Sequence, residues 1–133
     1  MDMRKMRKAY ICPYRYLQRL QDESRENVIR KGEDTMQFII TAYDGENMLE
    51  KRIAVRPRHL DGMAKLGDHV VCAGGLLDDK GKMKGSVLIL DFENRAALDD
   101  YLKNEPYVVE HVWEKIDVET MNVVIVNGEK VGG

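Results

Sequence analysis

The stretch MQFIITAY, residues 36–43, is the feature that most constrains how this chain can fold. As a strand it puts Phe38 and Ile40 on one face and Ile39 and Tyr43 on the other. A strand that is apolar on both faces has to be covered on both faces. The rest of the chain, or a partner, must therefore supply two covers for the sheet that holds this strand.

Periodicity and turn chemistry predict the order of the elements. Residues 49–66 have helical spacing, and Gly67 and Asp68 end that helix. The pattern then predicts a strand over 69–78, a turn at 79–82, a strand over 85–92, a helix over 95–103, a short helix beginning at Pro106 and a strand over 115–126. The βαββαβ order predicts an α+β fold of the ferredoxin-like type, with a four-stranded antiparallel sheet and helices on one face.

The helix over 49–66 is expected to face the core with an apolar stripe, and His59 lies at the edge of that stripe. The stripe consists of Leu49, Ile53, Leu60, Met63 and Ala64. Pro57 inside the helix costs roughly 3 kcal/mol and frees a backbone carbonyl. The resulting bend either aims His59 into a cleft or is a tolerated kink without a functional consequence.

The helices can cover only one face of the sheet, and the opposite face still carries apolar side chains. An uncovered apolar face of that size indicates a partner site. The simplest partner is a second copy of the chain, sheet against sheet about a two-fold axis. We therefore expect a homodimer through the sheet face, in the manner of a dimeric α+β barrel.

Charge separates an N-terminal extension from the rest. Residues 1–35 hold nine Lys or Arg and six Asp or Glu, whereas residues 36–133 hold twelve and seventeen. The extension is expected to be a marginal helix, a tail, or non-native upstream translation before a start at Met36, because Lys-Gly-Glu can be encoded by a purine-rich ribosome-binding sequence. The predicted domain covers 36–126, and 127–133 are predicted to be a frayed tail.

Composition excludes several classes of function. A formal net charge of −2 gives no indication of nucleic acid or an anionic membrane as partner. No apolar run approaches the roughly 18 residues that a membrane span needs, and no signal-peptide core follows the charged start, so a cytoplasmic location is expected. Cys12, Cys72 and three scattered histidines lack metal-ligand spacing, and Cys72 is expected to be buried. We expect a site without metal or cofactor.

Three stretches carry a resemblance to a known family. LEKRIAVRPRHL, GSVLILDFENRAALDDYL and EPYVVEHVWEKIDV resemble the YciI-like (YCII-related) family over about residues 36–126. The shared motifs are R-P-x-H-L on the first helix, a G-S strand after the hairpin, and D-P-[FY] beside a short helix. The resemblance implies a dimeric α+β barrel in which a His and an Asp meet in a cleft. One relative of the family acts as a dehydrochlorinase on a chlorinated hydroxyquinol.

The resemblance assigns roles residue by residue. His59 falls on the family histidine, and Glu105 stands where an aspartate is usual, which moves the carboxylate by one methylene. This pair is the implied catalytic group. The other recurrent positions, implied to bind substrate, are Asp44, Arg56, Gly75, Ser86 and Tyr107.

Each of these residues also has a structural interpretation. His59 can be a half-buried helix histidine, Glu105 can be a carboxylate favoured at a helix N-terminus, and Gly75 can serve packing alone. Arg56 can be a solvated surface residue.

Two classes of function follow. The first is a cofactor-free enzyme that uses a His/carboxylate pair for elimination or isomerisation of a small polar, hydroxylated cyclic substrate. The second is a non-catalytic module that binds a small ligand or a partner on the same dimer. Cofactor-free oxygenation is a third and weaker alternative.

Overall fold

The computed structural model describes residues 35–132, so the prediction for residues 1–34 of the extension lies outside the described part. Four antiparallel strands form one sheet in the order β2-β3-β1-β4. Their bounds are β1 (Met36–Asp44), β2 (Val70–Leu77), β3 (Met83–Phe92) and β4 (Trp113–Met121).

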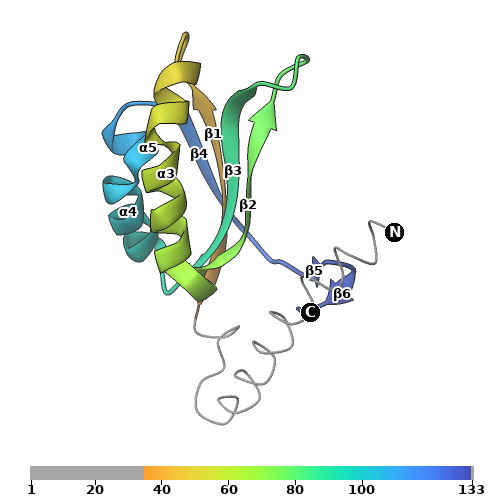
Figure 1. Ribbon diagram of the computed structural model, residues 1–133. Helices are drawn as coiled ribbons and strands as arrows, with labels where there is room; N and C mark the ends of the chain where they lie inside the picture. The colour runs from red at the N-terminus through yellow and green to blue at the C-terminus, as the bar shows by residue number, and fades with distance from the viewer. Residues whose placement is uncertain (1–34, 133) are drawn as a thin grey trace. The chain divides into compact units, whose positions relative to one another are not determined.

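All the helices of this part lie on one face of the sheet (Figure 1). They are α3 (Leu49–Leu66), the short 3₁₀ turn η1 (Gly67–His69), α4 (Arg95–Asn104) and α5 (Pro106–Val109). Strands and helices therefore follow one another in the βαββαβ order, and the predicted α+β class is confirmed. No helix within residues 35–132 is both long and apolar enough to cross a membrane.

The core lies between the sheet and the helices. Phe38 and Ile40 of β1 are buried there beside Leu88 and Leu90 of β3, with Leu98 of α4 packed over them. The register pairs Ile40 with Leu88 and Phe38 with Leu90, so one face of β1 and one face of β3 form a continuous apolar layer. This is the inward face that the alternation in residues 36–43 predicts.

The face that α3 turns to the core differs from the predicted apolar stripe. Ile53 and Leu60 are 58% and 46% exposed, whereas Arg52, Val55 and His59 are buried. His59 therefore lies in the middle of the buried face and not at its edge. The prediction was wrong because a polar side chain with partners inside the protein is indistinguishable, by hydrophobicity alone, from one that faces water.

Pro57 lies inside α3, which continues without interruption from Leu49 to Leu66. Both Pro57 and Ile53, whose carbonyl loses its usual helix donor, are exposed residues. The missing hydrogen bond is thus on the outer side of the helix, where water can replace it.

The last part of the chain also differs from the prediction of one strand over 115–126. β4 begins at Trp113 and ends at Met121, and a separate hairpin pairs β5 (Ile125–Val126) with β6 (Glu129–Lys130). Asn127 and Gly128 both have positive φ angles, 51° and 80°, as the tight turn of a two-residue hairpin requires. Asn-Gly is the residue pair that favours this turn, so part of the predicted tail is a strand.

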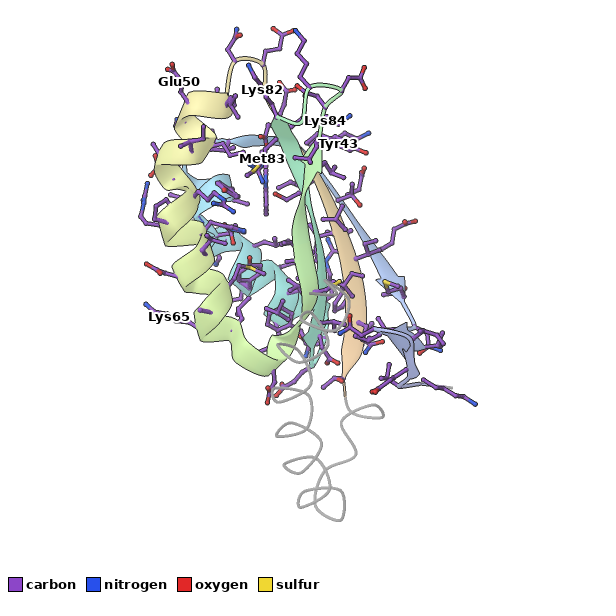
Figure 2. The ribbon with its side chains drawn as sticks, turned by 45° about the vertical axis from the view of Figure 1, so that its right-hand side comes forward. Tyr43, Glu50, Lys65, Lys82, Met83 and Lys84 are labelled. Carbon is purple, nitrogen blue, oxygen red and sulfur yellow. The ribbon has the colours of Figure 1, made fainter. Side chains whose placement is uncertain are left out.

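Within residues 35–132, the face of the sheet opposite the helices carries side chains but no covering helix (Figure 2). Ile39 pairs with Ile89 across β1 and β3, and both are partly exposed. Tyr43 is 41% exposed and Cys72 of β2 is exposed, although the sequence predicted a buried cysteine. The apolar run around Cys72 belongs to an edge strand.

Gly85 is the position where the sheet tolerates no side chain. A Cβ atom there would lie 2.4 Å from the carbonyl oxygen of Ala42, whereas a Cβ at Gly74 would meet nothing within 4 Å. We predict that Gly85→Ala lowers the free energy of unfolding by roughly 1–3 kcal/mol, because the β1–β3 pair must separate locally. Gly74→Ala is the control and should change it by less than about 0.5 kcal/mol in urea denaturation. Equal effects of the two substitutions would contradict the close approach.

Candidate active site

His59 and Glu105 form a buried pair. Nδ1 of His59 lies 2.6 Å from Oε1 of Glu105, and the side chains are 8% and 0% exposed. His59 comes from the buried face of α3, and Glu105 from the junction of α4 and α5. Because an ionised carboxylate can only accept, Nδ1 carries the hydrogen in this contact, and Nε2 is the nitrogen left to act on another molecule.

Glu105 also caps two helices. It is the C-cap residue of α4 and the N-cap residue of α5, where its Oε1 accepts a hydrogen bond of 3.2 Å from the backbone N–H of Tyr107. Pro106 follows at the first position of α5, where a missing N–H costs nothing. Glu105 therefore caps α5 and contacts His59 at the same time.

Tyr101 is a third member of this cluster, and the sequence analysis missed it. Its hydroxyl donates to Oε2 of Glu105, and it lies 3.3 Å from the sulfur of Met63 on α3. Burial first, and then the charge of Glu105, raise the pKa of the Tyr101 phenol. The signal in the sequence was the four-residue spacing between Tyr101 and Glu105 at the end of a helix.

A second cluster surrounds Arg52, which the sequence analysis also missed. Nη1 of Arg52 donates to both oxygens of Asp44 at 2.8 and 3.1 Å, and Nη2 donates to the hydroxyl of Ser86 at 2.7 Å. Nε lies 3.4 Å from the sulfur of Met83. Arg52 is 3% exposed, and each nitrogen of this buried guanidinium has a partner. Arg52 and His59 are seven residues apart, two helical turns, and this spacing could have revealed their common face.

Asp44 and Ser86, two of the predicted substrate-binding residues, thus contact Arg52. Burial raises the pKa of Asp44, and the Arg52 guanidinium opposes that effect. A Cβ on Gly75 would lie 3.7 Å from Nη2 of Arg52, so Gly75 also lies in this cluster. Arg56, by contrast, is exposed. Burial raises the pKa of the Tyr107 phenol, and the positive charges of Arg52 and then Arg56 oppose that rise.

Tyr107 joins the two clusters. Its ring is stacked on His59 with centroids 4.3 Å apart, and the guanidinium carbon of Arg52 lies 4.7 Å from its centroid. Trp113 packs beside it, 5.5 Å from Tyr107 and 6.2 Å from His59. The Tyr107 hydroxyl and the Trp113 indole N–H are buried and have no hydrogen-bond partner within residues 35–132. Two side chains that pack against His59 therefore each hold a buried donor without an acceptor among the described residues.

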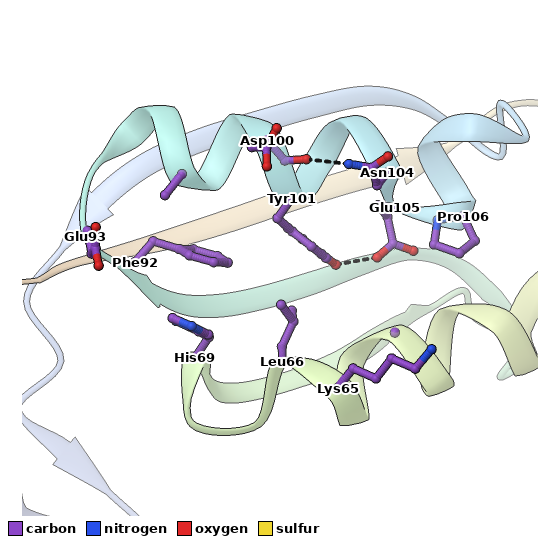
Figure 3. Close-up of a pocket in the computed structure, with 12 residues that line it drawn as sticks. Lys65, Leu66, His69, Phe92, Glu93, Asp100, Tyr101, Asn104, Glu105 and Pro106 are labelled. Carbon is purple, nitrogen blue, oxygen red and sulfur yellow. Dashed lines mark hydrogen bonds between the residues drawn. The ribbon is translucent and has the colours of Figure 1, made fainter.

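Two pockets adjoin these clusters. One, of about 540 Å³, lies between α3 and α4 and is lined among others by Leu66, Phe92, Tyr101 and Glu105 (Figure 3). The other, of about 590 Å³, is lined by Gly45, Glu46, Met48, His111, Trp113 and Glu114. Within the part of the chain described, no three His, Cys, Asp or Glu side chains are grouped as metal ligands would be.

The fold defines a class, the ferredoxin-like α+β proteins, and comparison with known proteins gives the family. The model of the YCII-related domain matches residues 36–122, and this chain belongs to that family. The resemblance of the three sequence stretches to YciI-like proteins is thereby confirmed.

Relatives by sequence include an uncharacterized protein of Haemophilus influenzae, 34% identical over 97 residues, and Protein YciI of Escherichia coli O6:H1, 33% identical over 97 residues. Each match covers 67% of this chain and 99% of the relative. Among solved structures, the chain is similar to 5-chloro-2-hydroxyhydroquinone dehydrochlorinase (TftG) of Burkholderia phenoliruptrix AC1100, in complex with 2,5-dihydroxybenzoquinone. The TM-score is 0.61 at 25% identity, over 65% of this chain and 94% of that one.

Arg52 is predicted to stabilise the fold through its buried partners. Arg52→Met would leave the carboxylate of Asp44, whose side chain is 6% exposed, without its counter-charge. We expect a loss of about 3–5 kcal/mol in the free energy of unfolding. Arg58→Met is the matched control on the same helix, because the ion pair of Arg58 with Glu110 is 3.4 Å long and exposed. It should cost less than about 1 kcal/mol in the same denaturation experiment.

Proposed function

We propose that this chain is a cofactor-free enzyme that uses His59 and Glu105 as an acid/base pair for elimination or isomerisation of a small polar, hydroxylated cyclic substrate. The observation that carries the proposal is the buried contact of 2.6 Å between His59 Nδ1 and Glu105 Oε1. A carboxylate at one imidazole nitrogen orients the ring and balances the positive charge that appears when the other nitrogen takes a proton.

The chemistry needs only these proton transfers. Nε2 of His59 removes a proton from the substrate, and the electron pair of the broken bond forms a new double bond. In an elimination the leaving group departs with its own electron pair. In an isomerisation the imidazolium returns the proton to a different atom of the substrate. The charge of Glu105 stabilises the imidazolium in both cases, and no oxidant or reductant is consumed.

The unpartnered donors support a substrate that carries oxygen. A buried donor without an acceptor costs roughly 1–3 kcal/mol, and a substrate carbonyl or phenolate oxygen at the Tyr107 hydroxyl or the Trp113 N–H would remove that cost. Arg56 adds positive charge near Tyr107. The guanidinium of Arg52 packs on the face of the Tyr107 ring and so fixes the position of that ring. The residues around Arg52, namely Asp44, Ser86 and Gly75, therefore support the site from the side of the sheet.

The similarity to the dehydrochlorinase supports the same substrate class. The name of that protein describes removal of chloride from a hydroxylated six-membered ring, and the compound in its structure is a dihydroxylated quinone. Both compounds present oxygen atoms around a planar ring. A ring of this kind is therefore the first substrate class to test with this chain.

One observation favours the alternative of a non-catalytic ligand-binding module. All three nitrogens of Arg52 contact protein groups, so this buried guanidinium is largely committed to Asp44, Ser86 and Met83 rather than to an anionic substrate. Glu105 in place of the expected aspartate is consistent with this alternative. A ligand would then bind at Tyr107 and Trp113 without reaction.

The test is a thermal-shift screen of hydroxyquinols, hydroxyquinones, lactones and hydroxy acids, followed by turnover assays of each binder. We expect binding to raise the melting temperature of the wild type and of His59→Gln. We also expect turnover to fall at least about 100-fold in His59→Gln. Lys51→Gln is the control, because Lys51 lies on the same helix as His59, is exposed, and lines neither of the two pockets. Binders that are never converted would establish the non-catalytic alternative.

We further propose that the chain is a homodimer through the open face of the sheet. The centre of that face is apolar, with Ile39 paired to Ile89. Lys115, Asp117 and Glu119 on β4 face the same side by register with β1 and are exposed. An apolar centre beside charges of both signs suits a two-fold contact between identical surfaces.

Ile89→Lys is predicted to shift the protein from dimer to monomer, because it places a charge in the apolar centre. Ile53→Lys is the matched control, since Ile53 is 58% exposed on the outer side of α3. It should leave the sedimentation coefficient unchanged. A wild-type protein that sediments as a monomer at micromolar concentration would refute the dimer.

A further inference from the structure

We propose that Tyr101 is a positioning residue for the His59–Glu105 pair, whose hydroxyl fixes Oε2 of Glu105 and whose ring closes the carboxylate off from the pocket between α3 and α4. The inference rests on the proposed function, because it assigns Tyr101 a role in the same acid/base pair. Tyr101 acts through Glu105 and is not assigned a contact with substrate.

The first argument is the hydrogen bonding of the carboxylate. Oε1 of Glu105 meets both Nδ1 of His59 and the backbone N–H of Tyr107, and Oε2 accepts from the Tyr101 hydroxyl. Within residues 35–132, Tyr101 is the one donor to Oε2. With both oxygens engaged, the carboxylate cannot turn about its last bond, and Oε1 stays directed at His59.

Glutamate needs this restraint more than aspartate does. It has one more rotatable bond, so more side-chain entropy is lost when its carboxylate is held in one position. Tyr101 lies four residues before Glu105 on the last turns of α4, within reach of the longer side chain. The Tyr101 contact thus accounts for how a glutamate can hold the position that an aspartate usually takes in this family.

The second argument is that Tyr101 is itself held in place. Its ring packs on Phe92 of β3 with centroids 6.0 Å apart and nearly parallel planes, at 24°. Its hydroxyl lies 3.3 Å from the sulfur of Met63 on α3. Burial and the neighbouring carboxylate both raise the pKa of the phenol, so the hydroxyl keeps its proton and remains a donor throughout the physiological range.

The third argument is the pocket. Tyr101 and Glu105 both line it, together with the ionisable residues Lys65, His69 and Asp100 (Figure 3). The side chain of Glu105 is nevertheless 0% exposed. Figure 3 shows the Tyr101 side chain reaching from α4 to the Glu105 carboxylate. Exclusion of water from Oε2 keeps the His59–Glu105 interaction in a low dielectric, where it is stronger.

The experiment is proton NMR of the full chain, which observes the hydrogen on Nδ1 of His59. A short hydrogen bond to a carboxylate moves that resonance far downfield and slows its exchange with water. We expect the downfield resonance in the wild type, an upfield shift in Tyr101→Phe, and loss of the resonance in Tyr101→Leu, where the cover is also removed. Tyr43→Phe is the matched control, because Tyr43 is an exposed phenol. It should leave the resonance unchanged.

Glu105→Gln separates this inference from the proposed function. If Glu105→Gln moves the resonance but Tyr101→Phe does not, the pair exists and the role of the Tyr101 hydroxyl is refuted. If neither variant moves it, the His59–Glu105 pair itself is refuted. Equal exchange rates in Tyr101→Phe and Tyr101→Leu would overturn the covering role of the ring. Circular dichroism and a melting curve for each variant show whether it is folded.

Discussion

The structure depends on how two polar residues on the inner face of α3 are satisfied. Arg52 and His59 lie where a helix usually carries apolar side chains. Burying either of them without a partner would lower the free energy of unfolding by several kcal/mol, so each needs partners inside the protein. β1 and β3 supply Asp44 and Ser86 to Arg52, and the α4–α5 junction supplies Glu105 to His59. Correct packing of α3 therefore requires both the sheet and the other helices to be in place.

The order of the elements could be predicted from the sequence because it rests on local signals. The alternation in β1 and Pro106 at the start of α5 each depend on neighbouring residues only, as does the N-cap of α4, where the Asn94 side chain accepts a hydrogen bond from the Ala97 N–H. The last strand was predicted as one run over 115–126, whereas residues 122–124 separate β4 from β5, and Asn127-Gly128 was interpreted as a frayed end. Its positive φ angles instead form a hairpin turn.

The candidate site could be predicted only in part. The family resemblance selected His59 and Glu105, and the structure brings them within 2.6 Å. Arg52 and Tyr101 were missed because a hydrophobicity pattern assigns charged and hydroxylated side chains to the surface. Whether such a side chain is buried depends on partners that are distant in the chain. Arg56 was selected in place of Arg52, although Arg52, four residues earlier, is buried and Arg56 is exposed.

The position of Glu105 has a consequence for how an acidic residue at this point of the fold is interpreted. One carboxylate ends α4, begins α5 and holds His59. A mutation at position 105 is therefore expected to lower the stability of the fold whether or not the protein has a reaction to perform. Selection for stability alone is enough to retain an acidic residue there, so a carboxylate at this position is not by itself a sign of catalysis.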